Sequence, residues 1–163
     1  MAKKAGKKSD GRKIVVKNKK ARFQYEILDT FEAGIVLRGS EVKSLRDGRA
    51  SLDGSFVRVS DGELLLTDAH IKRYTAGSSF NPDPTRARKL LMHKREIRRL
   101  ASLVAERGLT LIPLSIYFRR GRAKVELALA RGKTHRDKRR TIKEREAKRD
   151  IQREMARRHE GRR

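Results

Sequence analysis

The stretch TLIPLSIYFRRGRAKVELAL, residues 110–129, predicts the fold of this chain more clearly than any other part of its sequence. Apolar residues alternate with mostly polar ones on each side of Arg120-Gly121, and a period of two residues is typical of half-buried β-strands. We therefore expect an antiparallel hairpin with its turn at Arg120-Gly121. Pro113 has no backbone N–H to donate to a neighbouring strand, so it should lie at a sheet edge or a bulge. The alternating positions are Thr110, Ile112, Leu114, Ile116 and Phe118, then Ala123, Val125, Leu127 and Leu129.

Two segments closer to the N-terminus show the same period. Residues 23–37 alternate at Phe23, Tyr25, Ile27, Phe31, Ala33, Ile35 and Leu37, with an interruption at Asp29. So long a strand should bend or bulge, and we expect this within residues 30–34. Residues 56–59 and 64–67 flank Asp61-Gly62, which favours the positive φ angles of a tight hairpin turn.

Two helices are expected between the strands. Ser40 is a candidate N-cap for the first, which Gly48 should end, with Val42 and Leu45 on one face. The second should begin near His93 and end at Gly108, whereas the glycine, serines and prolines of residues 74–85 indicate a loop. Strands without regularly alternating helices predict a mainly β fold, a small antiparallel β-barrel with flanking helices, in preference to an open sheet.

Charge divides the chain into three parts. Its 44 Lys and Arg residues against 20 Asp and Glu give a formal net charge of +24, which indicates a polyanionic partner. Nucleic acid fits better than a membrane surface, because each neutralised phosphate releases condensed counterions. We expect a flexible basic arm at residues 1–17, the last of which could begin the fold, then a folded RNA-binding domain at 18–131 and a basic tail at 132–163. No stretch resembles a membrane span or a signal peptide, so a cytoplasmic protein is expected.

The residues that usually carry chemistry form no recognisable site. The chain has no cysteine, and its four histidines are far apart in the sequence, without the spacing of metal ligands. Gly132-Lys133-Thr134 resembles the end of a phosphate-binding loop, but Leu127 stands where that motif requires its first glycine. We therefore expect no enzyme, no metal and no cofactor.

Nine blocks of sequence, in order along almost the whole chain, resemble the small protein B family. No single block is specific for this family, but the order and spacing that all nine blocks share are specific for it. The blocks are Asn18-Lys19-Lys20-Ala21-Arg22, Phe31-Glu32-Ala33-Gly34, Gly39-Ser40-Glu41-Val42-Lys43-Ser44-Leu45-Arg46, Asp83-Pro84-Thr85-Arg86, Arg88-Lys89-Leu90-Leu91, Lys94-Arg95-Glu96-Ile97, Pro113-Leu114, Gly121-Arg122-Ala123-Lys124-Val125-Glu126 and Asp137-Lys138-Arg139.

This resemblance implies an oligonucleotide-binding-like barrel that holds the tRNA-like domain of transfer-messenger RNA, as a monomer with one RNA. The RNA-binding positions that it implies are Asn18, Lys19, Lys20, Arg22, Glu32, Leu91 and Lys124. Three of them have an alternative interpretation. Glu32 could pair with a neighbouring arginine as readily as it accepts hydrogen bonds from RNA. Leu91 could be a core residue and Asn18 could make a local turn, but the resemblance favours RNA contact for both.

The tail has little apolar surface to offset the entropy of ordering it, so we expect it to be disordered in the free protein. Residues 141–158 lack Gly and Pro, however, and carry Glu–Lys and Glu–Arg pairs at helical spacing, which indicates a latent helix. The resemblance implies that ribosomal RNA induces this helix in the empty messenger channel, beside the decoding centre of the small subunit. The ribosome-binding positions implied are Gly132, Lys133, His135, Arg136, Asp137, Lys138, Arg139 and Ile151.

One detail of the tail departs from the family pattern. Family members often have His immediately before the Asp-Lys-Arg triplet, whereas Arg136 stands there in this chain and His135 precedes it. Either side chain could stack on a base.

Two other functions fit a small basic chain with an extended tail. A ribosomal structural protein would remain on every ribosome after a salt wash, whereas a rescue factor would be recovered mainly on stalled ones. An RNA-processing enzyme is disfavoured because the sequence shows no catalytic constellation.

Overall fold

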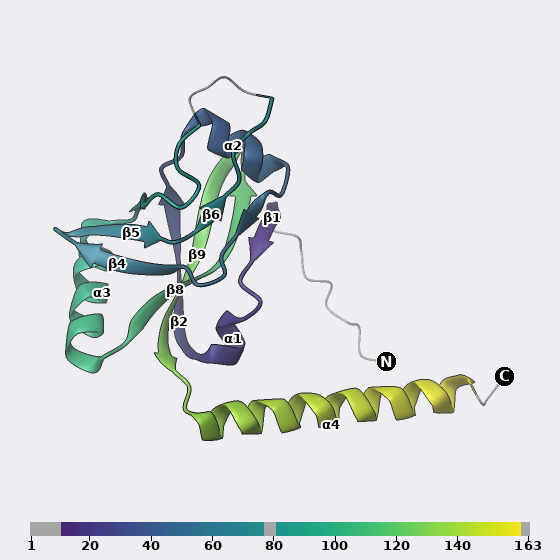
Figure 1. The fold of residues 1–163 in the computed structure, drawn as a ribbon. Coiled ribbons are helices and arrows are strands. Elements are labelled where there is room, and N and C mark those ends of the chain that lie inside the picture. Colours follow the sequence, from purple (N-terminus) through teal and green to yellow (C-terminus); the bar gives the residue numbers. More distant parts are fainter. Residues whose placement is uncertain (1–10, 77–80, 161–163) are drawn as a thin grey trace.

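The computed structural model describes residues 11–76 and 81–160, and it has a mixed α/β fold built on a large antiparallel sheet (Figure 1). The fold is therefore less purely β than the sequence predicted. The elements are β1 (Arg12–Lys17), α1 (Ala21–Gln24), β2 (Tyr25–Ile35), α2 (Gly39–Arg46), β3 (Ala50–Ser51), β4 (Phe56–Ser60), β5 (Glu63–Thr67), β6 (His70–Ile71), β7 (Arg88–Leu91), α3 (Lys94–Arg107), β8 (Thr110–Arg119), β9 (Arg122–Gly132) and α4 (His135–Glu160).

The pairings of the large sheet return to β8, the second strand of its order. Its strand order is β1-β8-β4-β5-β7-β2-β9, and β9 also pairs with β8. All of these pairings are antiparallel, while β3 and β6 form a separate two-stranded sheet. Strand β1 extends the large sheet beyond β8, so residues 12–17, which the sequence assigned to the basic arm, begin the fold. The rest of that arm, residues 1–10, lies outside the described residues.

Two bulges divide the apolar residues of the sheet between two clusters. The register shifts between Pro113 and Ser115 in β8, as Pro113 predicted, and between Ile27 and Asp29 in β2. The predicted bulge at residues 30–34 is therefore wrong by a few positions, because the extra residue of β2 is the exposed Leu28. A bulge moves the following side chains to the other face. Ile112 accordingly packs in a small cluster with α1, whereas Ile116 packs in the main core.

Local signals predicted both hairpins and both inner helices. Asp61 and Gly62 (φ 51° and 70°) turn the β4–β5 hairpin, and Arg120 and Gly121 (φ 49° and 76°) turn the β8–β9 hairpin. Helix α3 ends at Gly108, whose φ of 58° suits a residue without Cβ. The predicted cap of α2 is wrong, because the N-cap is Arg38, whose backbone N–H donates to Glu41 Oε2 at 2.7 Å. Residues 74–76 and 81–85 of the predicted loop contain no helix or strand, and residues 77–80 lie outside the described part.

The start of β2 and the tail differ from the prediction. Phe23 was expected in a strand but lies in α1, because the Asn18 side chain accepts a hydrogen bond from the Ala21 N–H at 3.0 Å and turns the chain there. The tail forms one helix, α4, which extends away from the sheet (Figure 1). Residues 161–163 lie outside the described part, and disorder of the tail in the free protein stays a prediction. No helix within the described residues is long and apolar enough to cross a membrane.

A buried ion pair joins α2 to β7. Arg88 is 0% exposed, and its Nε donates to Glu41 Oε1 at 2.8 Å. Arg86 Nη2 donates to the other carboxylate oxygen of Glu41 at 2.6 Å. Burial alone would raise the pKa of Glu41, but hydrogen bonds from Arg86 and the Arg38 N–H, with the charge of Arg88, lower it below its ordinary value.

Replacing Glu41 with Gln should destabilise the fold by about 3 kcal/mol, because it leaves the Arg88 guanidinium buried without a countercharge. Urea unfolding followed by far-UV circular dichroism would measure this loss. The pKa of Glu41 is lower in the folded protein than in the unfolded chain. As the pH falls, the Glu41 carboxylate is therefore protonated first in the unfolded chain. Wild-type stability should therefore decline below pH about 4.5, and more gently in Glu41→Gln.

The matched control is Asp53→Asn, which removes the exposed ion pair that Asp53 makes with Lys20 at 3.1 Å. This change should cost less than about 1 kcal/mol, since exposed pairs contribute little. Equal losses in the two variants would contradict the structural role of Glu41.

Candidate nucleic-acid interface

Glu32, in the middle of β2, lies at the centre of a cluster contributed by four strands. The Tyr117 hydroxyl of β8 donates a hydrogen bond to Glu32 Oε2. Lys124 Nζ of β9 lies 3.1 Å from Oε1, while Arg119 Nη1 of β8 and Arg12 Nη2 of β1 lie 3.5 and 4.0 Å from Oε2. One carboxylate thus holds three cations and a tyrosine together on the surface of the sheet.

The electrostatics of the cluster keep Glu32 ionised and Tyr117 protonated. The hydrogen bond from Tyr117, together with Lys124 and Arg119, lowers the pKa of Glu32 and outweighs the opposing effect of partial burial. Burial, and then the hydrogen bond to Glu32, raises the pKa of Tyr117 well above its ordinary value. The Arg12 guanidinium lies over the Tyr117 ring, 5.1 Å from its centroid, and helps to cover it.

Beside this cluster the sheet is hollowed by a groove of about 410 Å³. Gly34 in β2 pairs with Lys124 on one side and with Leu91 of β7 on the other. A Cβ at Gly34 would lie 3.2 Å from the Leu91 Cβ, so glycine gives Leu91 room to lie against the strand. Leu91 is 52% exposed, although it is a large apolar residue. We call this surface the Glu32–Leu91 face: Arg12, Glu32, Gly34, Leu91, Arg119, Arg122 and Lys124.

The Glu32–Leu91 face combines what a structured RNA requires. Its arginines and lysine donate hydrogen bonds that suit phosphate oxygens. The exposed leucine offers apolar contact to an unstacked base or a ribose. Glu32 already accepts from its neighbours, so its first effect is to fix where the cations stand.

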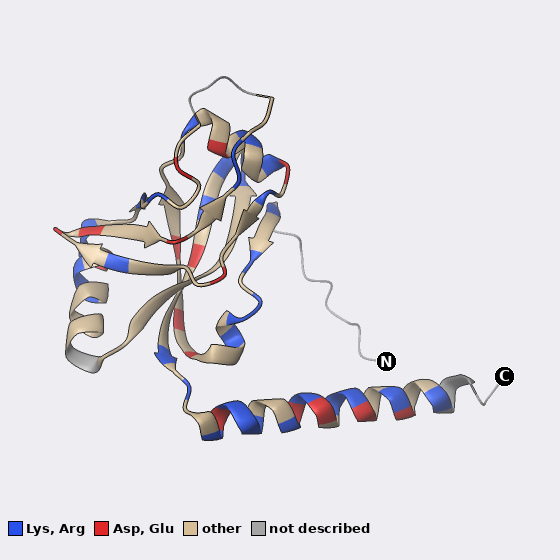
Figure 2. Cartoon of the chain, in the orientation of Figure 1, with Lys and Arg blue, Asp and Glu red and all other residues tan. Residues whose placement is uncertain are grey.

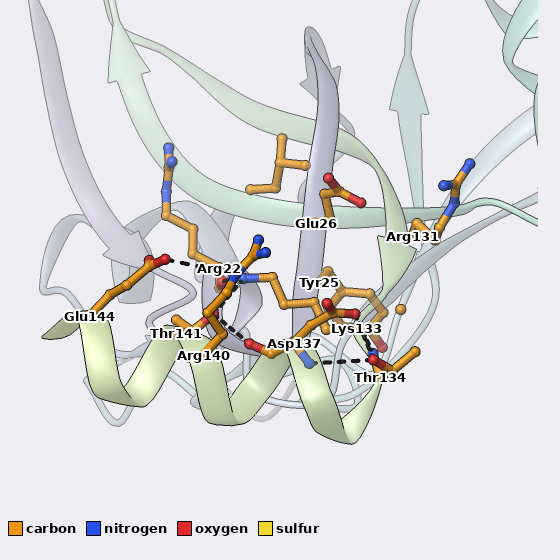
Figure 3. Close-up of a pocket in the computed structure, with 12 residues that line it drawn as sticks. Arg22, Tyr25, Glu26, Arg131, Lys133, Thr134, Asp137, Arg140, Thr141 and Glu144 are labelled. Atoms are coloured by element: carbon orange, nitrogen blue, oxygen red, sulfur yellow. Dashed lines mark hydrogen bonds and ion pairs between the residues drawn. The ribbon is translucent and has the colours of Figure 1, made fainter.

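A second polar site lies where the tail leaves the sheet. The Thr134 hydroxyl donates to Asp137 Oδ2 at 2.6 Å and accepts from the Asp137 N–H at 3.3 Å, and these bonds fix the start of α4. Lys133 Nζ donates to the Arg22 carbonyl of α1 at 3.1 Å. These residues line a cleft of about 590 Å³ between α1, the ends of β2 and β9, and α4 (Figure 3). The Thr134 hydrogen bonds lower the pKa of Asp137.

The family model for SmpB protein matches residues 15–157 of this sequence. This chain belongs to the SmpB family. It is 58% identical over 156 residues to the SsrA-binding protein of Acidothermus cellulolyticus, an alignment that covers 96% of this chain and 98% of that protein. The SsrA-binding protein of Pelotomaculum thermopropionicum is 57% identical over 141 residues, covering 86% of this chain and 92% of that protein.

A solved structure supports the same assignment. It is described as "tmRNA-SmpB: a journey to the center of the bacterial ribosome" and matches this SmpB-family chain with a TM-score of 0.63 and 57% identity. The match covers 74% of this chain and 85% of that one. The resemblance inferred from the sequence blocks is therefore confirmed.

The RNA-binding positions expected in this SmpB-family chain fall in two places. Glu32, Leu91 and Lys124 share the Glu32–Leu91 face. Asn18 lies at the corner between β1 and α1, where its amide donates to the Pro113 and Leu52 carbonyls at 3.1 and 3.3 Å. Its side chain therefore has the local turn role that the sequence left open. The remaining positions lie at the same corner: Lys19 and Lys20 precede α1, and Arg22 lies in it.

The expected ribosome-binding positions are spread along α4 and the segment before it. Gly132 ends β9 and pairs with Tyr25, and Lys133 bridges to α1. His135 and Arg136 are both exposed in the first turn, so the structure favours neither for stacking. Asp137 belongs to the helix cap, and Lys138 and Arg139 follow it. Ile151 is 53% exposed in the second half of the helix.

Of the partners of Glu32, sequence reasoning found Lys124 but missed Arg12, Tyr117 and Arg119. These three lie on β1 and β8, far from Glu32 in the chain. The signal that could have indicated Tyr117 is its position in the alternating pattern, where an aromatic hydroxyl stands among residues expected to face outward. The structure shows the hydroxyl engaged and the residue 1% exposed.

Replacing Tyr117 with Phe should raise the pKa of Glu32 toward 4.5, because the hydroxyl is the largest influence that lowers it. The ring remains to fill its place, so the fold should persist. Titration of the Glu32 carboxyl carbon by NMR measures the change. Ser115→Ala is the control, since this hydroxyl donates to Glu126 and not to Glu32. An unchanged pKa in Tyr117→Phe would show that the Tyr117–Glu32 bond is absent in solution.

Proposed function

We propose that this protein binds transfer-messenger RNA, the SsrA RNA, and delivers it to stalled ribosomes for trans-translation. It does so as a non-enzymatic RNA-binding protein. The observation that carries the proposal is the Glu32–Leu91 face, a cationic surface with an exposed leucine, in a chain whose close relatives are named SsrA-binding proteins. The solved structure that matches it is described in terms of tmRNA and SmpB.

The domain that holds the RNA is, in this proposal, an oligonucleotide-binding-like β-barrel spanning residues 18–131. Support comes from the pairings of β8, β4, β5, β7, β2 and β9, which return to β8. A closed sheet removes free edges and curves its outer face. The Glu32–Leu91 face lies on β1, β2, β7, β8 and β9, where it would receive the tRNA-like domain of one RNA molecule.

The tail, residues 132–163, acts in this proposal after the RNA is bound. Helix α4 carries both signs of charge along its length (Figure 2), and Ala147, Ile151 and Met155, at a spacing of four residues, are exposed on one side of it. Such a helix has a polyanion-compatible surface and a thin apolar stripe. In the empty messenger channel it would contact small-subunit ribosomal RNA near the decoding centre and report that no codon is present. The proposal also includes a basic arm at residues 1–17 and a cytoplasmic location.

Sequencing the RNA that co-purifies with tagged protein from its own cells should show strong enrichment of transfer-messenger RNA. Leu91→Glu should abolish this enrichment, because it places a carboxylate where the RNA backbone must approach. Leu28→Glu is the matched control: Leu28 is 47% exposed against 52% for Leu91, but lies at the bulge of β2 outside the Glu32–Leu91 face.

Ribosomal RNA without enrichment of transfer-messenger RNA would favour a ribosomal structural protein. Equal losses in the two leucine variants would show that the effect follows from added charge and not from this face.

The tail prediction concerns Ile151→Pro, which should leave RNA affinity nearly intact and stop tagging of stalled chains. Proline in a helix interior costs about 3 kcal/mol, more than an induced helix can lose. Tagging in a reconstituted translation system measures the effect, and Ile151→Ala is the control that keeps the helix. Normal tagging by the proline variant would contradict the helical mechanism. Failure of both variants would assign the role to the isoleucine side chain instead.

A further inference from the structure

Helix α3 has a surface that neither the fold nor the Glu32–Leu91 face explains. Ile97 and Leu100 are buried in the main core, with Leu103 and Val104 packed against it. Four cations, Lys94, Arg95, Arg98 and Arg99, lie on the exposed side of the helix. Neighbours among them are one, three or four residues apart in the sequence. This spacing places all four on one side of the helix, opposite its stripe of buried residues. Figure 2 shows this basic colouring on α3.

The arrangement opposes helix stability. Lys94/Arg98 and Arg95/Arg99 are like-charged pairs four residues apart, which repel each other. Lys94 and Arg95 also stand in the first turn, where the positive end of the helix dipole disfavours cations. His93 supplies no side-chain cap. Within the described residues, no carboxylate forms an ion pair with any of the four cations. Glu96, also in the first turn, suits the helix dipole but forms no ion pair with the four cations. Local rules broken with so little internal compensation are typical of a functional surface.

The cations of α3 follow the Glu32–Leu91 face closely in the chain. Leu91 ends β7 and Lys94 begins α3, so their Cα atoms are at most about 11 Å apart. A partner that touches Leu91 therefore reaches the first turn of α3. A membrane fits poorly, because an interfacial helix exposes its large apolar residues, and here Ile97 and Leu100 are buried in the core. An acidic protein would have to match four fixed positions, whereas an RNA backbone carries charge at every nucleotide.

We propose that RNA bound at the Glu32–Leu91 face continues onto α3, where Lys94, Arg95, Arg98 and Arg99 contact phosphates of its backbone. The inference rests on the proposed function, because it extends the site for the same transfer-messenger RNA. Binding places anions beside the like-charged pairs and removes their repulsion. Helix α3 thus adds affinity and fixes the direction in which the RNA leaves the face, while Leu91 and the Glu32 cluster select the RNA.

The test compares two full-length triple variants with equal charge change. Arg95→Gln, Arg98→Gln and Arg99→Gln remove three cations from α3. The control removes three exposed cations that flank the small β3–β6 sheet: Arg49→Gln, Lys72→Gln and Arg73→Gln. Binding to a full-length transfer-messenger RNA transcript is measured over a range of salt. The α3 variant should bind more weakly, with a salt slope smaller by roughly two to three, and the control should keep the wild-type slope.

Thermal unfolding separates binding from folding. Removing like charges from α3 should leave the unfolding temperature unchanged or raise it, so weaker binding by the α3 variant would not reflect a damaged fold. Hydroxyl-radical footprinting should show that the backbone positions exposed by the α3 variant adjoin those exposed by Leu91→Ala, which shortens the side chain without adding a charge. Wild-type affinity in the α3 variant, equal losses in the two triple variants, or exposed positions that do not adjoin would each overturn the proposal.

Binding to an unrelated RNA duplex of equal length is measured as well. This comparison distinguishes failure of the α3 proposal from failure of the proposed function. If the wild type binds both RNAs equally, the proposed function fails. The difference in salt slope between the two triple variants still reports on α3 in that case.

Discussion

The burial of the Arg88 guanidinium is the constraint on which the central part of this structure depends. A guanidinium has five N–H donors and cannot give up its charge inside a protein. Here Glu41 supplies the countercharge, and the carbonyls of Ala69, Pro84 and Arg86 accept at 2.6, 2.9 and 3.1 Å. Those acceptors come from α2 and from both ends of the long connection before β7. The hydrogen bonds of Arg88 therefore add to the strand pairings that hold β7 between β5 and β2.

Consequences follow for the surface, because β7 carries Leu91 outward and leads into α3. Next to β7, the bulges of β2 and β8 change which residues face outward, so the outer surface of the sheet differs between its two ends. At one end, Ile112 and Ala128 turn outward and are covered by α1, beside which α4 begins. At the other, Glu32 and Lys124 face outward and remain partly exposed. The same two bulges thus separate the Glu32–Leu91 face from the base of the tail. The proposed function, in which one part of the protein holds RNA and another probes the ribosome, requires this separation.

Local chemistry was predictable from the sequence, and pairing between distant strands was not. Arg120-Gly121 and Asp61-Gly62 identify their turns because positive φ angles favour few residues. Gly108 ends α3 for a similar reason. The bulge at Pro113 follows from a missing donor. The bulge at Leu28 is marked in the sequence only by the interruption of the alternating pattern at Asp29, which does not show where the extra residue lies. Its cause is the register against β9, which lies about a hundred residues away.

The candidate site divides in the same way. Glu32 and Leu91 entered through family resemblance, and pattern alone favoured a core position for Leu91. The ring of donors around Glu32 required the pairing of β1, β2, β8 and β9 to be known. Helix α4 was predicted as latent because its isolated sequence buries almost nothing. The structure adds what sequence could not supply, a Thr134–Asp137 cap and a bridge from Lys133 to α1.

Glu32 also fixes the positions of the cations around it. Tyr117 and Arg119 bind one of its carboxylate oxygens and Lys124 binds the other, while the side chain stays 31% exposed. Without Glu32, three cations within one small area would repel and spread over many conformations, and any phosphate could collect them. With Glu32 in place, they are held at fixed distances and partly neutralised, so only an RNA whose phosphates match those positions gains their full attraction. In the proposed function, a negative charge at the centre of this basic surface therefore raises selectivity by lowering the affinity for RNA that does not fit.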